Sequence, residues 1–455
     1  MTYTELFTDI LKLASQKGFE FTELYFEDHL SQSVKFANNK VENISSGQSR
    51  GVGIRVISEN SAGYAYTSEL TKKALTETLE AAGYLASKAT KNPTEVNISP
   101  LETSTEKETQ IPLRRQVELI QTAQDSAQLS NAIAQINIVL STGQKNILIL
   151  NSEGLIKSQT QQRTHFSTRI VASGDSGLQT GYEVIARVGD PSFLTENEVA
   201  QISKKAAEMA LIKLQAQPVP TGEMPVVLAK GSGGILFHEA CGHGLEADHI
   251  LKGASQFCNR LNTRVAPEYV TLVDDPTVEG YWGTLEIDDE GNNGSCTTLI
   301  KDGLLVGYMA DRLRAKHFNL RPANGRRQSY KHPPMVRMTN TFIKPSNLEP
   351  QEIIQDTKYG IYVSKLSGGQ VNTTTGDFVF GILEAYLIKD GEIKTPLREA
   401  NLIGNGLNTL SLIDAVGNDF DMSPGTCGKD GQQVPVGCGM PTLRVSKLTV
   451  GGTSK

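Results

Sequence analysis

The stretch Gly233-Gly-Ile-Leu-Phe-His238-Glu239-Ala-Cys-Gly-His243-Gly244 places two imidazoles and one carboxylate within six residues of a glycine-punctuated apolar run. In sites of the H-E-x-x-H kind, two histidines one helical turn apart bind zinc and the glutamate acts as the base. Here the spacing is H-E-x-x-x-H, and five steps of about 100° separate His238 and His243 by roughly 140° on a straight helix. The competing interpretation of this motif alone is a buried helix with two hydrogen-bonded histidines. A shared metal requires a widened turn, or a helix that ends before His243, and the glycines that flank His243 make such a break least costly.

Length and composition indicate a globular protein with more than one core. A chain of 455 residues predicts two domains of about 200 residues each. The net charge of −6 argues against nucleic acid or an anionic membrane as the main partner. No apolar stretch approaches the roughly 20 residues of a membrane span, and Glu5 and Asp9 interrupt the N-terminal apolar residues, unlike a signal peptide. The five cysteines are odd in number and widely spaced, which favours free thiols and a cytoplasmic location.

Residues 1–217 are predicted to form an α+β domain with an antiparallel sheet and long helices. Helical periodicity covers residues 4–16, 69–91 and 112–128, and strand-like alternation covers residues 24–36, 52–56, 133–149 and 166–184. Asn38-Asn39 marks a turn. A capping box from Thr195 to Glu198 begins a further helix, which the linker Pro218-Val-Pro-Thr-Gly222 ends. We expect this domain to serve packing, substrate entry or subunit pairing.

Residues 218–455 are predicted to form a mostly antiparallel, barrel-like β domain that carries the motif helix. Asp302-Gly303 and Asp390-Gly391 are typical of tight hairpin turns. Residues 335–343 alternate as a strand. The fold class expected for the whole chain is therefore α+β.

Two further stretches of this second part are interpreted as irregular structure. The glycine-rich residues 423–441 suit neither a helix nor a plain strand, so we expect a shaped loop. The acidic clusters Asp274-Asp275 and Asp288-Asp289-Glu290 are expected to be solvated turn residues rather than a second metal site.

A catalytic zinc usually takes three protein ligands, so the two histidines need a third. His249 follows His243 by six residues, the step that metzincins use, but the position that wants glycine there is Glu246. Glu246 could itself ligate through a tight turn. Cys427 offers a thiolate from the glycine-rich stretch. Spacing alone leaves Cys427 and His249 close together as candidates.

Several motifs of the second part occur together in one known family. They are the H-E-x-x-x-H stretch, Asp288-Asp-Glu-Gly291, Arg337-Met-Thr-Asn340-Thr, and Cys427-Gly-Lys-Asp-Gly-Gln with Val-Pro-Val-Gly. In this order they resemble the TldD/PmbA metallopeptidase family, over nearly the whole of residues 218–455. The PmbA-type subunit lacks H-E-x-x-x-H, so the chain resembles the TldD-type catalytic subunit.

The resemblance implies a zinc metallopeptidase. His238, His243 and Cys427 fall at the positions of the family's zinc ligands, and Glu239 falls at the position of its catalytic base. Cys438 is a second thiol eleven residues after Cys427, and its simple interpretation is a packed small residue. The family implies hydrolysis of flexible peptides or unfolded protein segments through a metal-activated water. It also implies a PmbA-type partner subunit, or a second copy of the chain, and a substrate bound by backbone pairing at a strand edge.

A rival function is a non-catalytic, zinc-containing modulatory protein of the gyrase-modulator type. Such a site would be closed by four protein ligands, for example with His249 joining Cys427. For an enzyme, a further donor to the developing oxyanion is needed, and Tyr330, His332 and Arg337 are candidates. The sequence leaves this role open, because Arg337 equally suits a structural ion pair and His332 a surface position.

Overall fold

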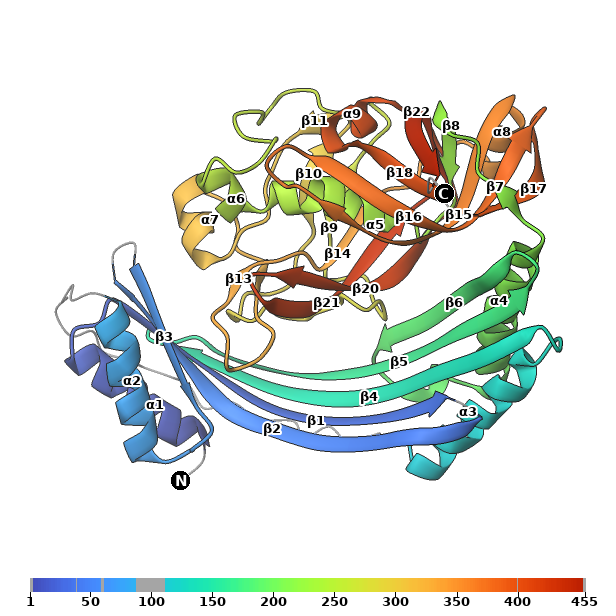
Figure 1. Cartoon of the computed structure of the whole chain (residues 1–455). Coiled ribbons are helices and arrows are strands. Elements are labelled where there is room, and N and C mark those ends of the chain that lie inside the picture. The colour runs from blue at the N-terminus through green and yellow to red at the C-terminus, as the bar shows by residue number, and fades with distance from the viewer. Residues whose placement is uncertain (1–2, 38, 59–60, 87–110, 399, 453–455) are drawn as a thin grey trace.

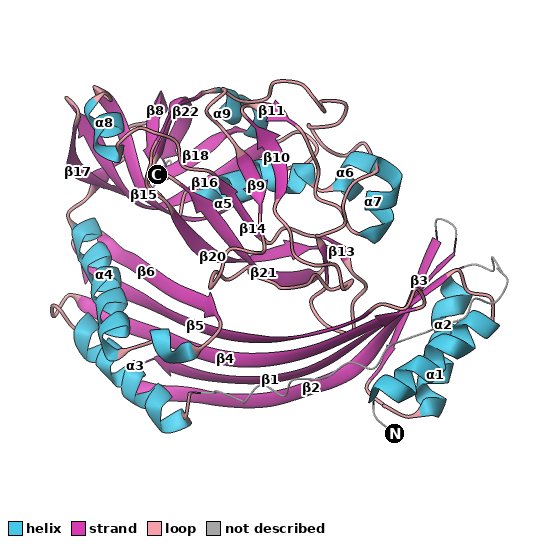
Figure 2. Ribbon diagram, turned by 180° about the vertical axis from the view of Figure 1, so that it is seen from behind, coloured by secondary structure: helices cyan, strands magenta, loops and turns pink. Residues whose placement is uncertain are grey.

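The structure of the chain is a computed structural model that describes residues 3–37, 39–58, 61–86, 111–398 and 400–452 (Figure 1). A long curved sheet from the first half of the chain lies beneath a second body formed by the second half. The α+β class is confirmed, since helices and mostly antiparallel sheets occur in both parts (Figure 2). Among the described residues, no helix has the length and apolar character needed to cross a membrane.

The first half forms one antiparallel sheet with the strand order β3-β2-β1-β4-β5-β6. Its strands are β1 (Phe21–Ala37), β2 (Lys40–Ser58), β3 (Ser61–Thr67), β4 (Ile133–Asn151), β5 (Ile156–Gly174) and β6 (Gly177–Val188). The two groups of alternating residues predicted from the sequence join through the long β1–β4 pairing. A single sheet therefore extends beneath the whole second body.

Four helices gather at the two ends of this sheet (Figure 1). They are α1 (Tyr3–Gln16) and α2 (Lys72–Leu85) at one end, and α3 (Leu113–Ala127) and α4 (Glu196–Leu214) at the other. Thr195 caps α4 as predicted, because its hydroxyl accepts a hydrogen bond from the Glu198 N–H at 3.2 Å. Residues 87–91 of the helix predicted over 69–91, and Asn38 of the predicted turn, lie outside the described residues.

The period of two along β4 gives the sheet two different faces. The β4 residues that pack with the helices are Ile138, Leu140, Leu148 and Leu150. Ile147 and Ile149 point to the opposite face, where they pack with Tyr330 of the second body. One face of the sheet is thus covered by helices and the other by the second half of the chain.

The second half contains a closed barrel and a second sheet. The barrel has the strand order β15-β8-β22-β18-β16 and closes because β15 also pairs with β16. Outside the barrel, β17 pairs with β16, β7 pairs with β17, and β19 pairs with β22. The second sheet has the order β11-β10-β9-β14-β21-β20, and β12 pairs with β13. The strands are β7 (Gln217–Pro218), β8 (Gly222–Leu228), β9 (Leu272–Asp274), β10 (Thr297–Lys301), β11 (Leu304–Leu305), β12 (Gly325–Arg326), β13 (Met335–Val336), β14 (Asn340–Ile343), β15 (Tyr359–Val371), β16 (Asp377–Lys389), β17 (Glu392–Arg398), β18 (Ala400–Asn405), β19 (Ile413–Val416), β20 (Asp421–Lys429), β21 (Gln432–Met440) and β22 (Leu443–Gly452). The helices are α5 (Gly234–Phe237), α6 (Ala247–Leu251), α7 (Arg312–Phe318), α8 (Pro350–Gln355) and α9 (Gly406–Ser411).

This architecture confirms the barrel-like prediction and refines its details. Asp302-Gly303 connects β10 to β11 and Asp390-Gly391 connects β16 to β17, all with the positive φ that tight turns need. The strand predicted over 335–343 is interrupted between β13 and β14. The division of the chain after residue 217 stays a prediction; Gln217 and Pro218 themselves pair with β17.

The expectation of a shaped loop over residues 423–441 is wrong, because this stretch is the β20–β21 hairpin. Asp430 and Gly431 form its turn with φ of 47° and 76°. The glycines serve close packing between strands: a Cβ at Gly437 would lie 2.3 Å from Asn340 Oδ1. With so few side chains, the hairpin lacks the alternation by which strands are predicted.

The expectation that the acidic clusters are solvated turn residues is also wrong, except for Asp275, which accepts hydrogen bonds within its own turn. Asp274 is fully buried, and its carboxylate accepts hydrogen bonds from Thr339, Thr341 and Asn324. Asp288, Asp289 and Glu290 are buried as well. Asp288 accepts hydrogen bonds mainly within its own turn. The donors to Asp289 and Glu290 come from distant parts of the chain, so the local sequence could not predict their burial.

A buried ion-pair network ties the curved sheet to the second body. Arg55 on β2 lies 2.7 Å from Glu23 on β1 and 2.6 Å from Glu290. Arg327 lies 2.5 Å from the other oxygen of Glu23. All four side chains are nearly inaccessible to solvent, so each charge depends on its partners.

Candidate metal centre

The H-E-x-x-x-H stretch forms a widened turn, the first of the two alternatives that its spacing allows. After α5, residues His238–Gly242 form one turn of π-helix, and a 3-10 turn over His243–Leu245 follows. The His243 N–H donates to the His238 carbonyl, the i→i+5 bond of a π turn. This wider turn brings the two imidazole rings to 5.3 Å between centroids.

Glycines around the turn permit close packing rather than a break in the helix. A Cβ at Gly242 would lie 2.2 Å from Met338 Sδ, and one at Gly234 would lie 2.6 Å from the Gly439 N atom on β21. Both glycines keep helical surroundings with no positive φ. The motif therefore sits directly against β21 and the segment before β14.

Cys427 reaches the two histidines from β20. Its Sγ lies 3.3 Å from His243 Nε2, and the ligand atoms of His238, His243 and Cys427 all lie within 4.8 Å of one another. All three side chains are buried. Three donors from two distant segments thus converge on one point.

The three side chains suit a metal ion in their chemistry. Neither ring nitrogen of His238 has a hydrogen-bond partner among the described residues, although both are buried. Burial alone would raise the pKa of the Cys427 thiol, but His238 and His243 outweigh it and hold its pKa well below the ordinary value. Imidazole nitrogen and thiolate sulfur are both ligands that zinc takes, and catalytic zinc sites use three protein ligands. The residues present therefore fit a zinc ion.

Glu239 lies beside this group and remains accessible to water. Its Oε2 is 3.7 Å from His243 Nε2, the ring nitrogen that also faces Cys427, and its side chain is 24% exposed. A carboxylate in this position can accept a proton from a water molecule at the metal.

The alternative third ligands lie on the other side of the His243 ring. Glu246 is fully buried, and its Oε2 is 3.1 Å from His243 Nδ1. Burial disfavours its charge, yet His243 and Lys429 outweigh that cost and lower the pKa of Glu246 to about 2. His249 Nε2 lies 3.6 Å from the same carboxylate. Neither residue joins the group formed by His238 and Cys427.

Sequence reasoning assigned no role to Glu246 as a partner of His243, nor to Lys429. A carboxylate on the second nitrogen of a metal-binding imidazole fixes its tautomer and orientation. The signal was present, because Glu246 follows His243 by three residues and a helical turn brings such positions together. Lys429 gave no comparable signal.

Two of the three oxyanion candidates serve packing or hold the hairpin. Tyr330 is buried between the curved sheet and the second body. Arg337 is fully buried and donates to the carbonyls of Cys427 at 2.5 Å and Gln432 at 3.3 Å, so the ion-pair alternative is wrong. His332 is partly exposed, and its Nδ1 lies 3.0 Å from Ser329 Oγ. Arg337 therefore positions the strand that carries Cys427.

Cys438 is buried on β21, and its sulfur belongs to the surroundings of His238. Burial disfavours charge on His238, but the thiols of Cys438 and Cys427 outweigh this and raise its pKa well above the ordinary value. Cys438 is not one of the residues whose ligand atoms converge.

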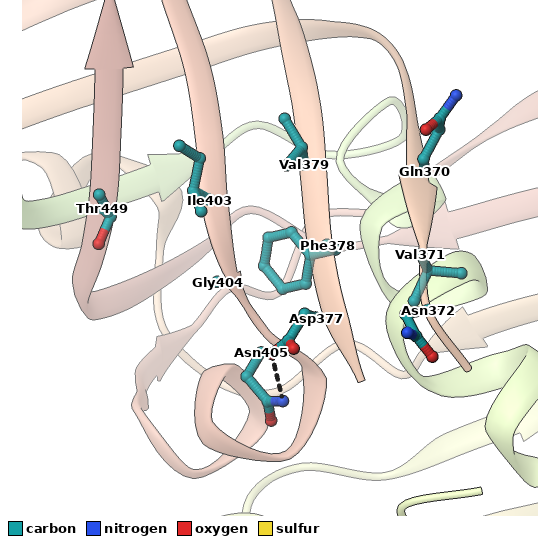
Figure 3. Close-up of a pocket in the computed structure, with 10 residues that line it drawn as sticks. All are labelled: Gln370, Val371, Asn372, Asp377, Phe378, Val379, Ile403, Gly404, Asn405 and Thr449. Atoms are coloured by element: carbon teal, nitrogen blue, oxygen red, sulfur yellow. Dashed lines mark hydrogen bonds between the residues drawn. The ribbon is translucent and has the colours of Figure 1, made fainter. Parts of the chain in front are cut away.

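A hollow of about 620 Å³ lies away from these residues, on the barrel (Figure 3). Val379, Ile403 and Thr449 stand on the neighbouring strands β16, β18 and β22 and line it together with Gln370 of β15. None of the predicted site residues borders it. The hollow is therefore separate from the convergence of His238, His243 and Cys427.

Family models match most of the chain. The PmbA/TldA metallopeptidase C-terminal domain matches residues 221–452, domain 1 of that family matches residues 22–86, and its central domain matches residues 106–214. All the motifs that carry the resemblance lie within the first of these matches.

Curated relatives match along nearly their whole length. A metalloprotease TldD homolog of Buchnera aphidicola subsp. Schizaphis graminum is 36% identical over 95% of this chain and 93% of that protein. A metalloprotease TldD homolog of Haemophilus influenzae is 34% identical over 99% and 97%. A zinc metalloprotease TldD homolog of Saccharolobus solfataricus is 28% identical over 97% and 99%.

Solved structures share the fold at low sequence identity. A Thermotoga maritima protein described as a candidate modulator of DNA gyrase superposes with a TM-score of 0.81 at 19% identity, over 99% of this chain and 100% of that one. TldE from Thermococcus kodakarensis superposes with a TM-score of 0.73 at 19% identity, over 98% and 99%.

Proposed function

The chain belongs to the TldD/PmbA metallopeptidase family, and from this we propose that it is a zinc-dependent peptidase whose metal is held by His238, His243 and Cys427. The observation that carries the proposal is the convergence of these three buried donors, two of them on a π turn and one on a distant strand. The buried, unpartnered ring nitrogens of His238 add to it, since such atoms are costly without a partner.

A zinc ion held there supplies Lewis acidity and lowers the pKa of a water molecule toward neutrality. Glu239 then acts as general base: it takes the proton of the attacking water and gives it to the leaving amine. Glu246 keeps the His243 ring oriented through Nδ1, so that Nε2 faces the metal position. Arg337 holds the carbonyl of Cys427 and with it the thiolate.

We propose flexible peptides or unfolded protein segments as substrates. β20 carries Cys427 and is the terminal strand of its sheet, with no partner strand on its outer edge in the part of the chain that is described. The free N–H and C=O groups of such an edge can pair with an extended peptide without selecting its side chains. An extended substrate would thus lie beside the thiolate.

The proposal includes a partner and a location. A PmbA-type subunit, or else a second copy of this chain, is the proposed partner, in line with the TldE structure that shares the fold. All five cysteines are free thiols, which suits the reducing cytoplasm.

The alternative, a modulatory protein with a closed zinc site, has the fold likeness to the Thermotoga maritima protein in its favour. A closed site needs a fourth protein ligand. His249 is the candidate for that role, but it lies behind His243, where it approaches Glu246. This placement favours an open, catalytic site.

The test is hydrolysis of an unstructured, casein-like peptide by the purified chain, alone and mixed with a PmbA-type subunit. We expect cleavage that a chelator abolishes and added zinc restores. Absence of chelator-sensitive cleavage in both samples, with zinc bound at one ion per chain, would favour the modulatory alternative.

A further inference from the structure

Lys429 stands two residues beyond Cys427 on β20, so both side chains leave the strand on the same face. Cys427 Sγ lies 3.3 Å from His243 Nε2. Lys429 Nζ lies 3.0 Å from Glu246 Oε2, the oxygen that is 3.1 Å from His243 Nδ1. Both nitrogens of one imidazole are therefore tied to one strand, directly through the thiol and indirectly through Glu246.

The ammonium group of Lys429 has a complete set of acceptors. Besides Glu246, it donates to Asp248 at 2.8 Å and to the Val336 carbonyl at 3.0 Å. An ammonium has three N–H bonds, so each finds a partner. The Lys429 side chain is only 5% exposed, and Glu246 is fully buried. Loss of this cation would leave two carboxylates without their compensating charge.

The same cation explains a second cluster of possible ligands. Glu246, Asp248 and His249 place ligand atoms within 4.8 Å of one another, as a metal site would. Lys429 Nζ bonds to both carboxylates of this group. Lys429 thus supplies the positive charge there, and Glu246 remains available to orient His243.

We propose that Lys429 is a positioning residue, which holds the Cys427 strand in register with the π turn and fixes Glu246 on His243. The proposal rests on the proposed zinc site. A slip of the strand by one residue would turn the Cys427 side chain to the opposite face, and the contacts of Lys429 oppose such a slip. Disturbed partners of a ligating histidine typically weaken metal binding by about 10- to 100-fold.

The test compares metal binding by Lys429→Met, Lys429→Arg and a matched control. The control is Lys365→Met, which removes another partly buried ion pair, that with Glu183 at 2.6 Å on β6. Zinc affinity is measured by competition with a chromophoric chelator, and the thiolate-to-cobalt absorption band is recorded after substitution with Co²⁺. We expect about 10- to 100-fold weaker zinc binding and a diminished band for Lys429→Met. We expect wild-type values for the control and an intermediate result for Lys429→Arg, which keeps the charge but not its geometry.

The outcomes separate this inference from the proposed function. Wild-type zinc affinity and an unchanged cobalt spectrum in Lys429→Met would overturn the role of Lys429 and leave the zinc site intact. A wild-type protein without a thiolate-to-cobalt band would overturn the zinc site, and the inference with it. If Lys429→Met does not fold, Lys429→Arg and Asp248→Asn decide, because unchanged zinc affinity in both variants would overturn the inference.

Discussion

Replacement of Glu239 by Gln removes the proposed proton acceptor and keeps the size of the side chain. Glu239 Oε2 lies 3.7 Å from His243 Nε2, on the side of the ring that faces Cys427. The other carboxylate of this region, Glu246, is held on the far side of the ring by His243 Nδ1 and by Lys429. No second carboxylate among these residues is placed to take over the role.

The expected loss follows from the size of general-base catalysis. A positioned base contributes about 10²- to 10⁴-fold in rate, which is about 3 to 5 kcal/mol at about 1.4 kcal/mol for each factor of ten. Because Glu239 is not one of the converging donors, zinc content should stay at the wild-type level. The fall should appear in kcat, since the proton transfer belongs to the chemical step.

The assay follows cleavage of a fluorescence-quenched, unstructured peptide under saturating conditions, with zinc quantified in the same preparations. Glu268→Gln, at an exposed glutamate of the second half, serves as the control and should keep full activity. Two results would contradict the role of Glu239 as the base: a Glu239→Gln protein with kcat within a factor of ten of wild type, or one that loses its zinc together with its activity.

Three further predictions concern the thiol, acid stability and the contact between the two halves. Cys427→Ser should lose stoichiometric zinc while Cys438→Ser retains it, as measured by metal analysis; the opposite pattern would assign the ligand to Cys438. Burial, with Lys145 and Arg163, lowers the pKa of His29 from 6.5 to about 4. Between these two pH values the unfolded chain binds more protons than the folded chain, so the free energy of unfolding falls as the pH falls from 6.5 to about 4. The loss is at most about 3 kcal/mol at about 1.4 kcal/mol per pH unit, and urea unfolding at pH 7 and pH 4.5 should show a smaller loss in His29→Gln. Arg55→Met leaves two buried carboxylates short of a partner and should lower the free energy of unfolding in urea by about 3 to 5 kcal/mol. The exposed control Lys17→Met should change it by less than about 1 kcal/mol. Equal effects of the two substitutions would contradict the role of the buried network.

The need for an irregular turn at the metal motif could be predicted from the sequence, because it follows from helix geometry alone. The step of five residues from His238 to His243 exceeds one ordinary turn, so a shared metal requires either a wider turn or a helix that ends before His243. The structure has a π turn at this position. Asp302-Gly303 and Asp390-Gly391 were predictable for the same reason, since tight turns impose positive φ locally.

The β20–β21 hairpin could not be predicted, because close packing against other segments determines its sequence and leaves no alternation of apolar and polar residues. Glycines such as Gly437 occur where another chain segment comes within a side chain's width. Without side chains on both faces, the stretch has no period of two to detect. The residue Cys427 was identified through the family resemblance, and its distance of 184 positions from His243 explains why spacing could not decide.

The burial of the charged side chains could not be predicted from the sequence for a related reason. Glu290 and Asp289 belong to an acidic turn, whereas their partners Arg55 and Tyr25 come from the curved sheet. Only the assembled fold supplies the cations that make burial of such a cluster favourable. Lys429 is a similar case, since its partners Glu246 and Asp248 lie more than 180 positions earlier.

X-ray absorption at the zinc edge of the zinc-loaded protein tests the proposed metal centre most directly. The proposed centre should show one sulfur near 2.3 Å and two imidazole nitrogens near 2.0–2.1 Å, with a remaining light-atom position for water. The sulfur should disappear from the spectrum in Cys427→Ser. A wild-type spectrum without sulfur, or one with a second sulfur and no open position, would contradict the assignment of His238, His243 and Cys427.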